Sequence, residues 1–232
     1  MKEKLLRQLE AQRSVMGVME NNLQVWQSVK EIRKNYDTFV RNIKKIGDCL
    51  AVTGTDLEPL KEKMRLSRES TIGHLLPIAG VMEVFAGDTG DRKLAKIAKA
   101  TIKSPEKMKT SSLRKYCLEV LKRASGLLES PAAGTKGKDD HHLSGYGLTV
   151  KHIQRLQESS DFFCHVVDNY EEALEKRDKY ETRLERYIQD NKMILTRKLD
   201  RTILLFRDSH KEFHDSYFRA RFHGGKKHES LG

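Results

Sequence analysis

The sequence TIGHLLPIAGVMEVFA, from Thr71 to Ala86, decides the fold of this 232-residue chain. It carries one charge, Glu83, and one histidine, His74, whereas the sequence around it is dense in Lys, Arg, Glu and Asp. A helix that is apolar on every side must be covered by other elements. We therefore expect a helix over residues 57–86 at the centre of a bundle of amphipathic helices. The apolar run is shorter than the ~20 residues that a membrane span needs.

Three small or rigid residues, Gly73, Pro77 and Gly80, interrupt this central helix. A proline inside a helix removes one backbone donor and favours a kink. Glycines let a neighbouring helix approach closely, so we expect a close helix contact here. For His74 we favour a hydrogen-bonded histidine of the core over a ligand.

The sequence before this helix predicts one long helix. Apolar residues recur every three or four positions from Leu5 to Leu50, and Gly54 is a natural end. The apolar stripe slips in phase near Trp26, where we expect a bend. The next residues, Thr55–Glu58, have the Ser/Thr-x-x-Glu form of a capping box, and Pro59 suits the first turn of the central helix.

The segment Gly87–Asp91 predicts a turn. One interpretation makes Asp88 and Asp91 ligands of a cation, and the favoured one makes Asp91 the N-cap of a helix over residues 92–102. Ser104-Pro105 then predicts the start of another helix, which runs to about residue 129.

The last third of the chain has a helical pattern from residue 148 to 208, followed by a short helix to 222. A single helix over 148–208 would be ~90 Å long, so we expect a turn within residues 166–179. We predict an all-α fold, an elongated, mostly antiparallel bundle of about six helices. We expect one domain over residues 1–222, with a mobile loop at 130–146 and a disordered basic tail at 223–232.

The composition favours a reduced, soluble, cytoplasmic protein. Three scattered cysteines, Cys49, Cys117 and Cys164, form neither a disulfide framework nor a metal pattern. They are expected to be reduced thiols of the core. The N-terminus lacks the apolar region of a signal peptide.

The motifs of common enzyme classes are absent from the sequence. No histidine follows a glutamate at the Glu-x-x-His spacing of di-iron bundles, and neither a phosphate-binding loop nor a Gly-x-Ser-x-Gly elbow occurs. We therefore expect a non-enzymatic protein without a cofactor. The weak metal candidates are His210 and His214, whose i, i+4 spacing suits one helix face; a solvated polar face is the favoured alternative.

A basic segment lies between Arg92 and Arg123, with eleven Lys and Arg residues against two acids. Such a segment can follow a phosphate backbone or another anionic surface, although no aromatic residue is interleaved over 92–115 to stack on bases. A solvated lysine-rich face is the plainer alternative. The anion-binding candidates are Arg92, Lys93, Lys96, Lys99, Lys103, Lys107 and Lys109.

Four groups of residues give the chain a likeness to known proteins: Ile78-Ala79-Gly80, Thr89-Gly90-Asp91, Tyr146-Gly147-Leu148-Thr149, and the closing motif from Leu205 to Arg221. In this order they resemble an uncharacterised family of bacterial all-helical proteins. The closing motif is the most specific part, and it departs from the family where His210-Lys211 replace Asn-Pro. The resemblance implies a helical bundle with no assigned activity.

Taken together, the sequence predicts a structural or interaction protein, with a protein partner or self-association. One alternative is binding of nucleic acid or another polyanion through residues 92–123. Another is a bundle that binds a metal or a small ligand.

Overall fold

The computed structural model describes residues 2–103, 105–129 and 142–223, and over these residues it contains helices and no strand. The predicted all-α fold is confirmed. The chain divides into two compact units, Met1–Thr55 with Leu174–Gly232 and Asp56–Ala173. Each unit has its own hydrophobic core, whereas we had expected one domain.

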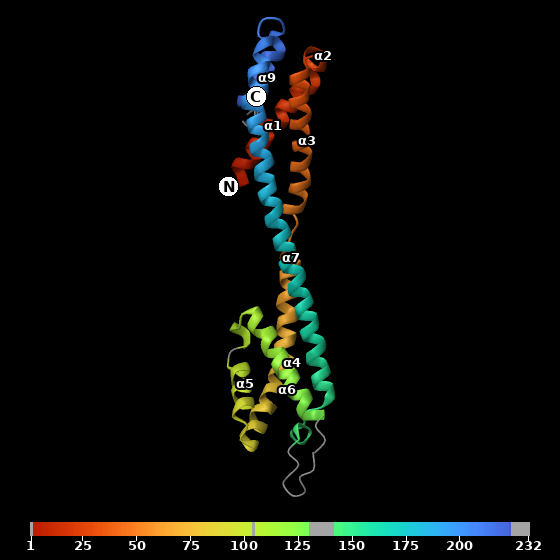
Figure 1. The fold of residues 1–232 in the computed structure, drawn as a ribbon, viewed down its shortest axis with the longest axis vertical. Helices are drawn as coiled ribbons and strands as arrows, with labels where there is room; N and C mark the ends of the chain where they lie inside the picture. Colours follow the sequence, from red (N-terminus) through yellow and green to blue (C-terminus); the bar gives the residue numbers. More distant parts are fainter. Residues whose placement is uncertain (1, 104, 130–141, 224–232) are drawn as a thin grey trace, which may run out of the picture. The chain divides into compact units, whose positions relative to one another are not determined.

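Unit 1 joins the two ends of the chain (Figure 1). Helix α1 packs mainly on α9, and the core between the helices includes Met19, Trp26, Phe39, Ile188 and Tyr217. Its elements are α1 (Lys2–Asn21), α2 (Leu23–Trp26), α3 (Lys30–Thr53), the second half of α7 (Val150–Ile194), the π-helical turn η3 (Leu195–Leu199), α8 (Asp200–Ile203), the 3-10 turn η4 (Leu204–Phe206) and α9 (Lys211–His223).

The single long N-terminal helix that we predicted is wrong, because the chain breaks on both sides of α2. The break lies where the apolar stripe slips in phase. The Trp26 side chain folds back, and its Nε1 donates to the Met19 carbonyl oxygen at 2.8 Å. The indole is 2% exposed and meets the Tyr36 ring edge-on at 4.8 Å. The buried indole thus lies at the break, where it bonds to the end of α1 and packs on a residue of α3.

Unit 2 is built around α4 (Glu58–Thr89), and Figure 1 shows α5 beside it. Its core includes Leu75, Met82, Leu113, Leu156 and Phe163. The other elements are α5 (Arg92–Ile102), the 3-10 turn η1 (Pro105–Lys107), α6 (Thr110–Glu129), the 3-10 turn η2 (Leu143–Tyr146) and the first half of α7.

The turn between α4 and α5 confirms the capping interpretation. Gly90 has φ +73°, a left-handed conformation that glycine adopts without strain. Asp91 Oδ1 accepts hydrogen bonds from the backbone N–H groups of Lys93 and Leu94, both at 3.0 Å. The carboxylate of Asp91 is therefore used by the helix, and α5 starts where the sequence predicts.

Helix α4 is covered on one face rather than all round. Pro77 is exposed, Val84 is 56% exposed, and no described atom of another element lies within 4 Å of a Cβ built on Gly73 or Gly80. The predicted close helix contact is therefore wrong. His74 is half-buried and has no hydrogen bond among the described residues, so it is not the satisfied core histidine that we expected.

Two further expectations about helix boundaries are wrong. Thr55 does not cap α4: its Oγ1 donates back to the Ala51 carbonyl at 3.3 Å, and Asp56 Oδ1 accepts from the Glu58 N–H instead. Pro105 starts the short turn η1, and α6 begins only at Thr110.

The predicted turn within residues 166–179 is also wrong, since α7 is continuous over 45 residues. The two apolar stripes of this helix serve different cores. Phe163 and Val167 belong to the core of unit 2, and Leu184 and Ile188 belong to that of unit 1. The charged residues between the stripes are mostly exposed.

Two predicted segments fall largely outside the described residues. Residues 130–141 of the expected loop lie outside them, whereas its end forms η2, in which Leu143 is fully buried. The expected tail also lies outside them apart from His223, which ends α9.

Candidate functional site: the basic face of α5

Helix α5 separates apolar and basic residues onto opposite sides. Leu94, Ala98 and Thr101 are buried against unit 2. At 3.6 residues per turn, Arg92, Lys96, Lys99 and Lys103 fall within about 60° of one another on the opposite side. We call these four residues the basic stripe.

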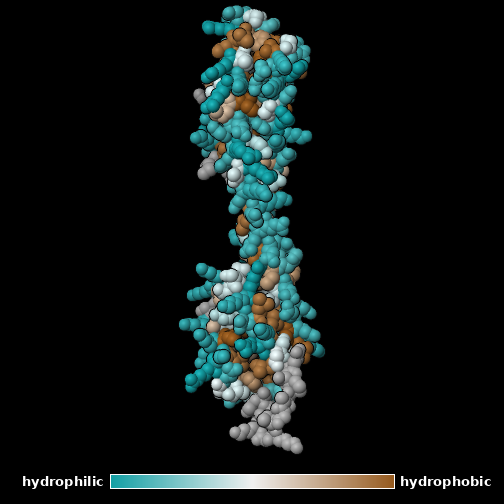
Figure 2. Space-filling model, in the orientation of Figure 1, coloured by the Kyte–Doolittle hydropathy of each residue, from teal (hydrophilic) through white to brown (hydrophobic). Residues whose placement is uncertain are grey.

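The seven predicted anion-binding residues are all exposed, from Arg92 in α5 to Lys109 before α6. Figure 2 shows hydrophilic side chains along the outer edge of the part of unit 2 where α5 lies. Among the described residues, Arg92, Lys93, Lys96 and Lys99 form no ion pair, and α5 contains no acidic residue. The positive charge of Arg92, Lys96 and Lys99 is therefore not neutralised by an acid of their own helix.

Two basic residues of α4 are paired with acids one turn away. Arg65 donates to Glu62 at 2.6 Å and to Glu69 at 2.5 Å, and its hydrogen bond to Glu62 is the largest cause that raises the pKa of this guanidinium. Lys61 pairs with Glu58 in the same way. What distinguishes α5 from α4 is that α5 contains no acidic residue that could pair with its cations in this way.

An arginine of α4 positions the segment that follows α5. The Arg68 guanidinium donates to the backbone carbonyls of Pro105, Glu106 and Met108. These contacts hold η1 against α4 and fix the path of the chain between α5 and α6. The sequence does not indicate this structural role, because Arg68 looks like any other charged residue of α4, such as Arg65.

Not every cation between residues 92 and 123 is available to a ligand. Arg114 donates to Asp168 Oδ1 at 2.7 Å and to the Cys164 carbonyl at 3.0 Å, which ties α6 to α7. Lys115 and Lys122 are exposed on α6. The site is therefore the seven residues predicted before α6, with the basic stripe as its most regular part.

The two candidate metal ligands lie close in sequence but face different surroundings. His210 is exposed, whereas His214 Nδ1 lies 2.9 Å from Asp215 Oδ1 and its Nε2 is buried without a hydrogen-bond partner. The His214 ring also packs on Phe218, with the centroids 4.8 Å apart. In the part of the chain that the structure describes, no group of three or more His, Cys, Asp or Glu side chains converges on one point.

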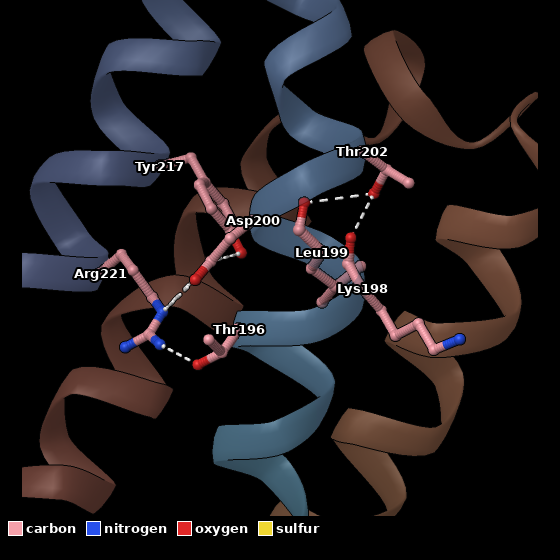
Figure 3. Close-up of polar contacts among 7 residues, drawn as sticks. All are labelled: Thr196, Lys198, Leu199, Asp200, Thr202, Tyr217 and Arg221. Carbon is pink, nitrogen blue, oxygen red and sulfur yellow. Dashed lines mark hydrogen bonds and ion pairs between the residues drawn. The ribbon is translucent and has the colours of Figure 1, made fainter.

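A polar cluster that the sequence did not reveal joins α8 to α9 (Figure 3). Asp200 accepts from the Tyr217 hydroxyl at 2.8 Å and from Arg221 Nε at 3.1 Å, while the Arg221 Nη2 donates to Thr196 at 3.0 Å. Burial, then the charge of Asp200, raises the pKa of Tyr217. All members have partners within the cluster, so we assign it to the fold, where it closes the hairpin of α7 and α9.

The cysteines are free, and Cys49 and Cys117 are buried as predicted. Burial raises the pKa of Cys117 to about 11, so this thiol stays protonated near neutral pH.

By length and composition alone, a stretch within Lys30–Thr89 is apolar enough to cross a membrane, but buried core helices meet the same criterion.

Comparison with family models, with curated proteins and with solved structures finds no match to this chain. The resemblance to a bacterial helical family thus stays a prediction.

Proposed function

We propose that this chain is a non-enzymatic interaction protein that binds nucleic acid through the basic stripe of α5. The observation that carries the proposal is the arrangement of four exposed cations on one helix face, opposite the buried face and without acidic neighbours in that helix. A solvated surface does not require such segregation, since Arg65 and Lys61 show cations paired with acids on α4.

The dimensions of the stripe suit a phosphate backbone. From Arg92 to Lys103 the helix rises about 16 Å, at 1.5 Å per residue. Cations at this spacing meet several phosphates of one strand and release the counterions condensed on them. Lys107 and Lys109 extend the positive surface beyond the end of α5.

The same surface predicts binding without base readout. Lysine makes point-charge contacts with phosphate, and α5 has no Asn, Gln or aromatic residue for base edges or base stacking. We therefore propose binding that depends weakly on sequence and strongly on salt.

Fluorescence anisotropy of a short labelled DNA duplex tests the proposal. At low salt we expect saturable binding at micromolar protein, with similar affinity for two unrelated sequences. The variant Lys96→Gln/Lys99→Gln should bind roughly tenfold more weakly, because two phosphate contacts are lost. The matched control is Lys176→Gln/Lys179→Gln, which removes two exposed lysines at the same spacing from α7.

Two results would overturn the proposal. One is unchanged anisotropy of the duplex at low salt. The other is an equal loss of affinity in both double variants, because binding would then follow net charge and not the surface of α5. Vesicles of anionic lipid that compete fully with the duplex would reassign the surface to membranes.

A further inference from the structure

A cavity of about 450 Å³ opens in unit 1 among the first turns of α1, the end of α3 and the second half of α7. Its volume lies within the range of small-molecule sites. The residues that line it are Leu5, Leu6, Leu9, Leu50, Thr53, Gly54, Glu181, Leu184, Glu185 and Ile188. We call it the α1–α3–α7 groove.

The floor of the groove is apolar and belongs to the core. Leu9, Leu184 and Ile188 are each at most 8% exposed, and Leu5 and Leu50 pack against the same cluster. Leu6 stands at the rim and is 50% exposed. An apolar group that enters here would be removed from water on several sides, which favours its binding.

The charged groups that line the groove are both carboxylates. Glu181 and Glu185 lie one turn apart on α7, a spacing at which like charges repel. Glu181 has a long contact with Arg177 Nε at 3.5 Å, and Glu185 forms no ion pair within the described ranges. A cation placed beside these two groups would relieve their repulsion.

The end of α3 adds a further negative contribution. Thr53 and Gly54, the last residue and the C-cap of this 24-residue helix, line the groove, and its last turn contains no basic residue. The C-terminal end of a helix carries partial negative charge and favours cations. The two carboxylates and the end of α3 thus all contribute negative potential at the apolar cavity.

We infer that the α1–α3–α7 groove binds a small amphiphilic cation, an apolar chain or ring system that bears one ammonium group. The leucines and Ile188 take the apolar part, and the ammonium group lies between the carboxylates and the end of α3. This inference uses residues of unit 1 and does not depend on nucleic-acid binding by α5.

Isothermal titration calorimetry with three probes of the same chain length tests this inference. The probes are decyltrimethylammonium, decyl sulfate and decanol, each below the concentration at which it self-associates. We expect saturable binding of the cation, weaker binding of decanol and the weakest binding of decyl sulfate. The variant Glu181→Gln/Glu185→Gln should bind the cation roughly fivefold more weakly, as expected for half-exposed ion pairs, and leave decanol affinity unchanged.

A second pair of variants tests the location. Leu6→Ser should weaken the cation and decanol alike, because it removes apolar surface at the rim. Leu118→Ser removes a leucine that is 64% exposed on α6 and should change neither affinity. Circular dichroism checks that every variant is folded.

The inference is overturned if the cation fails to bind, if decyl sulfate binds as tightly, or if the Glu-to-Gln variant keeps full affinity for the cation. An equal effect of Leu6→Ser and Leu118→Ser would also overturn it. Loss of duplex binding by the α5 variants leaves these outcomes untouched, so the two proposals fail independently.

Discussion

The amide of Asn42 in α3 donates from Nδ2 to the Oδ1 of Asn191 in α7 at 3.0 Å, inside the core of unit 1. Asn191 is fully buried, and its own Nδ2 donates to Gln12 Oε1 and to the Phe39 carbonyl. Gln12 Nε2 then donates to the Ile188 carbonyl at 3.1 Å. Three amides, one each from α1, α3 and α7, thus fix the register of the three helices against one another.

Replacement of Asn191 by Leu should destabilise unit 1 by about 3 kcal/mol, because buried amide groups of Asn42 and Gln12 lose their partners. Urea denaturation, followed by the fluorescence of Trp26, measures this change within unit 1. The triple variant Gln12→Leu/Asn42→Leu/Asn191→Leu should cost less than the single one, since no half-satisfied amide is left. A cost of the single variant under about 0.5 kcal/mol, typical of surface sites, would contradict this role.

Removal of the Asp91 cap should loosen the start of α5. Asp91→Ala loses two hydrogen bonds to backbone N–H groups, and we expect unit 2 to lose about 1 kcal/mol of stability. Thermal unfolding by circular dichroism gives the value. Asp178→Ala, at an exposed position within α7, is the control and should change little. Equal effects of the two substitutions would show that the cap contributes nothing.

The Tyr217–Asp200 hydrogen bond predicts a loss of stability at alkaline pH. Burial and Asp200 raise the pKa of Tyr217, so the folded state keeps the phenol proton after the unfolded chain has lost it. The stability from this group is complete below the ordinary tyrosine pKa of about 10 and falls as pH rises above it.

Urea titrations between neutral and alkaline pH check this prediction. Tyr217→Phe should be less stable than the parent at neutral pH, through the lost hydrogen bond to Asp200. Above the tyrosine pKa the stability of Tyr217→Phe should also fall less steeply with pH, because unfolding releases up to one proton fewer. Part of the slope should remain, since the pKa of Tyr36 is raised as well. Parallel pH profiles of the two proteins would contradict the account.

The sequence predicts the fold class and several local features, because these depend on neighbouring residues. The cap at Asp91 and the amphipathic α5 follow from short-range spacing, and the anion-binding residues are exposed for the same reason. Long-range arrangement is harder to predict. The charged residues in the middle of α7 predict a turn from the sequence. In the structure they lie within a continuous helix, between one apolar stripe that packs in the core of unit 2 and another that packs in the core of unit 1.

Contacts between distant residues account for the other differences. The partner of Asn42 lies 149 positions away, and the groove needs Leu6, Leu50 and Leu184 from three helices. Periodicity places Leu50 and Leu184 on inward faces but does not show which faces meet. The break beside Trp26 likewise lies where one large ring is buried in the core.

The salt dependence of duplex binding tests the central claim most directly. If the four cations of the basic stripe contact phosphates, a plot of log K against log salt concentration should have a slope of about −4 for the parent protein. The slope of Lys96→Gln/Lys99→Gln should be shallower by about 2. The Lys176→Gln/Lys179→Gln control should keep the parental slope. Identical slopes for the parent protein and the α5 variant would contradict the assignment of nucleic-acid binding to α5.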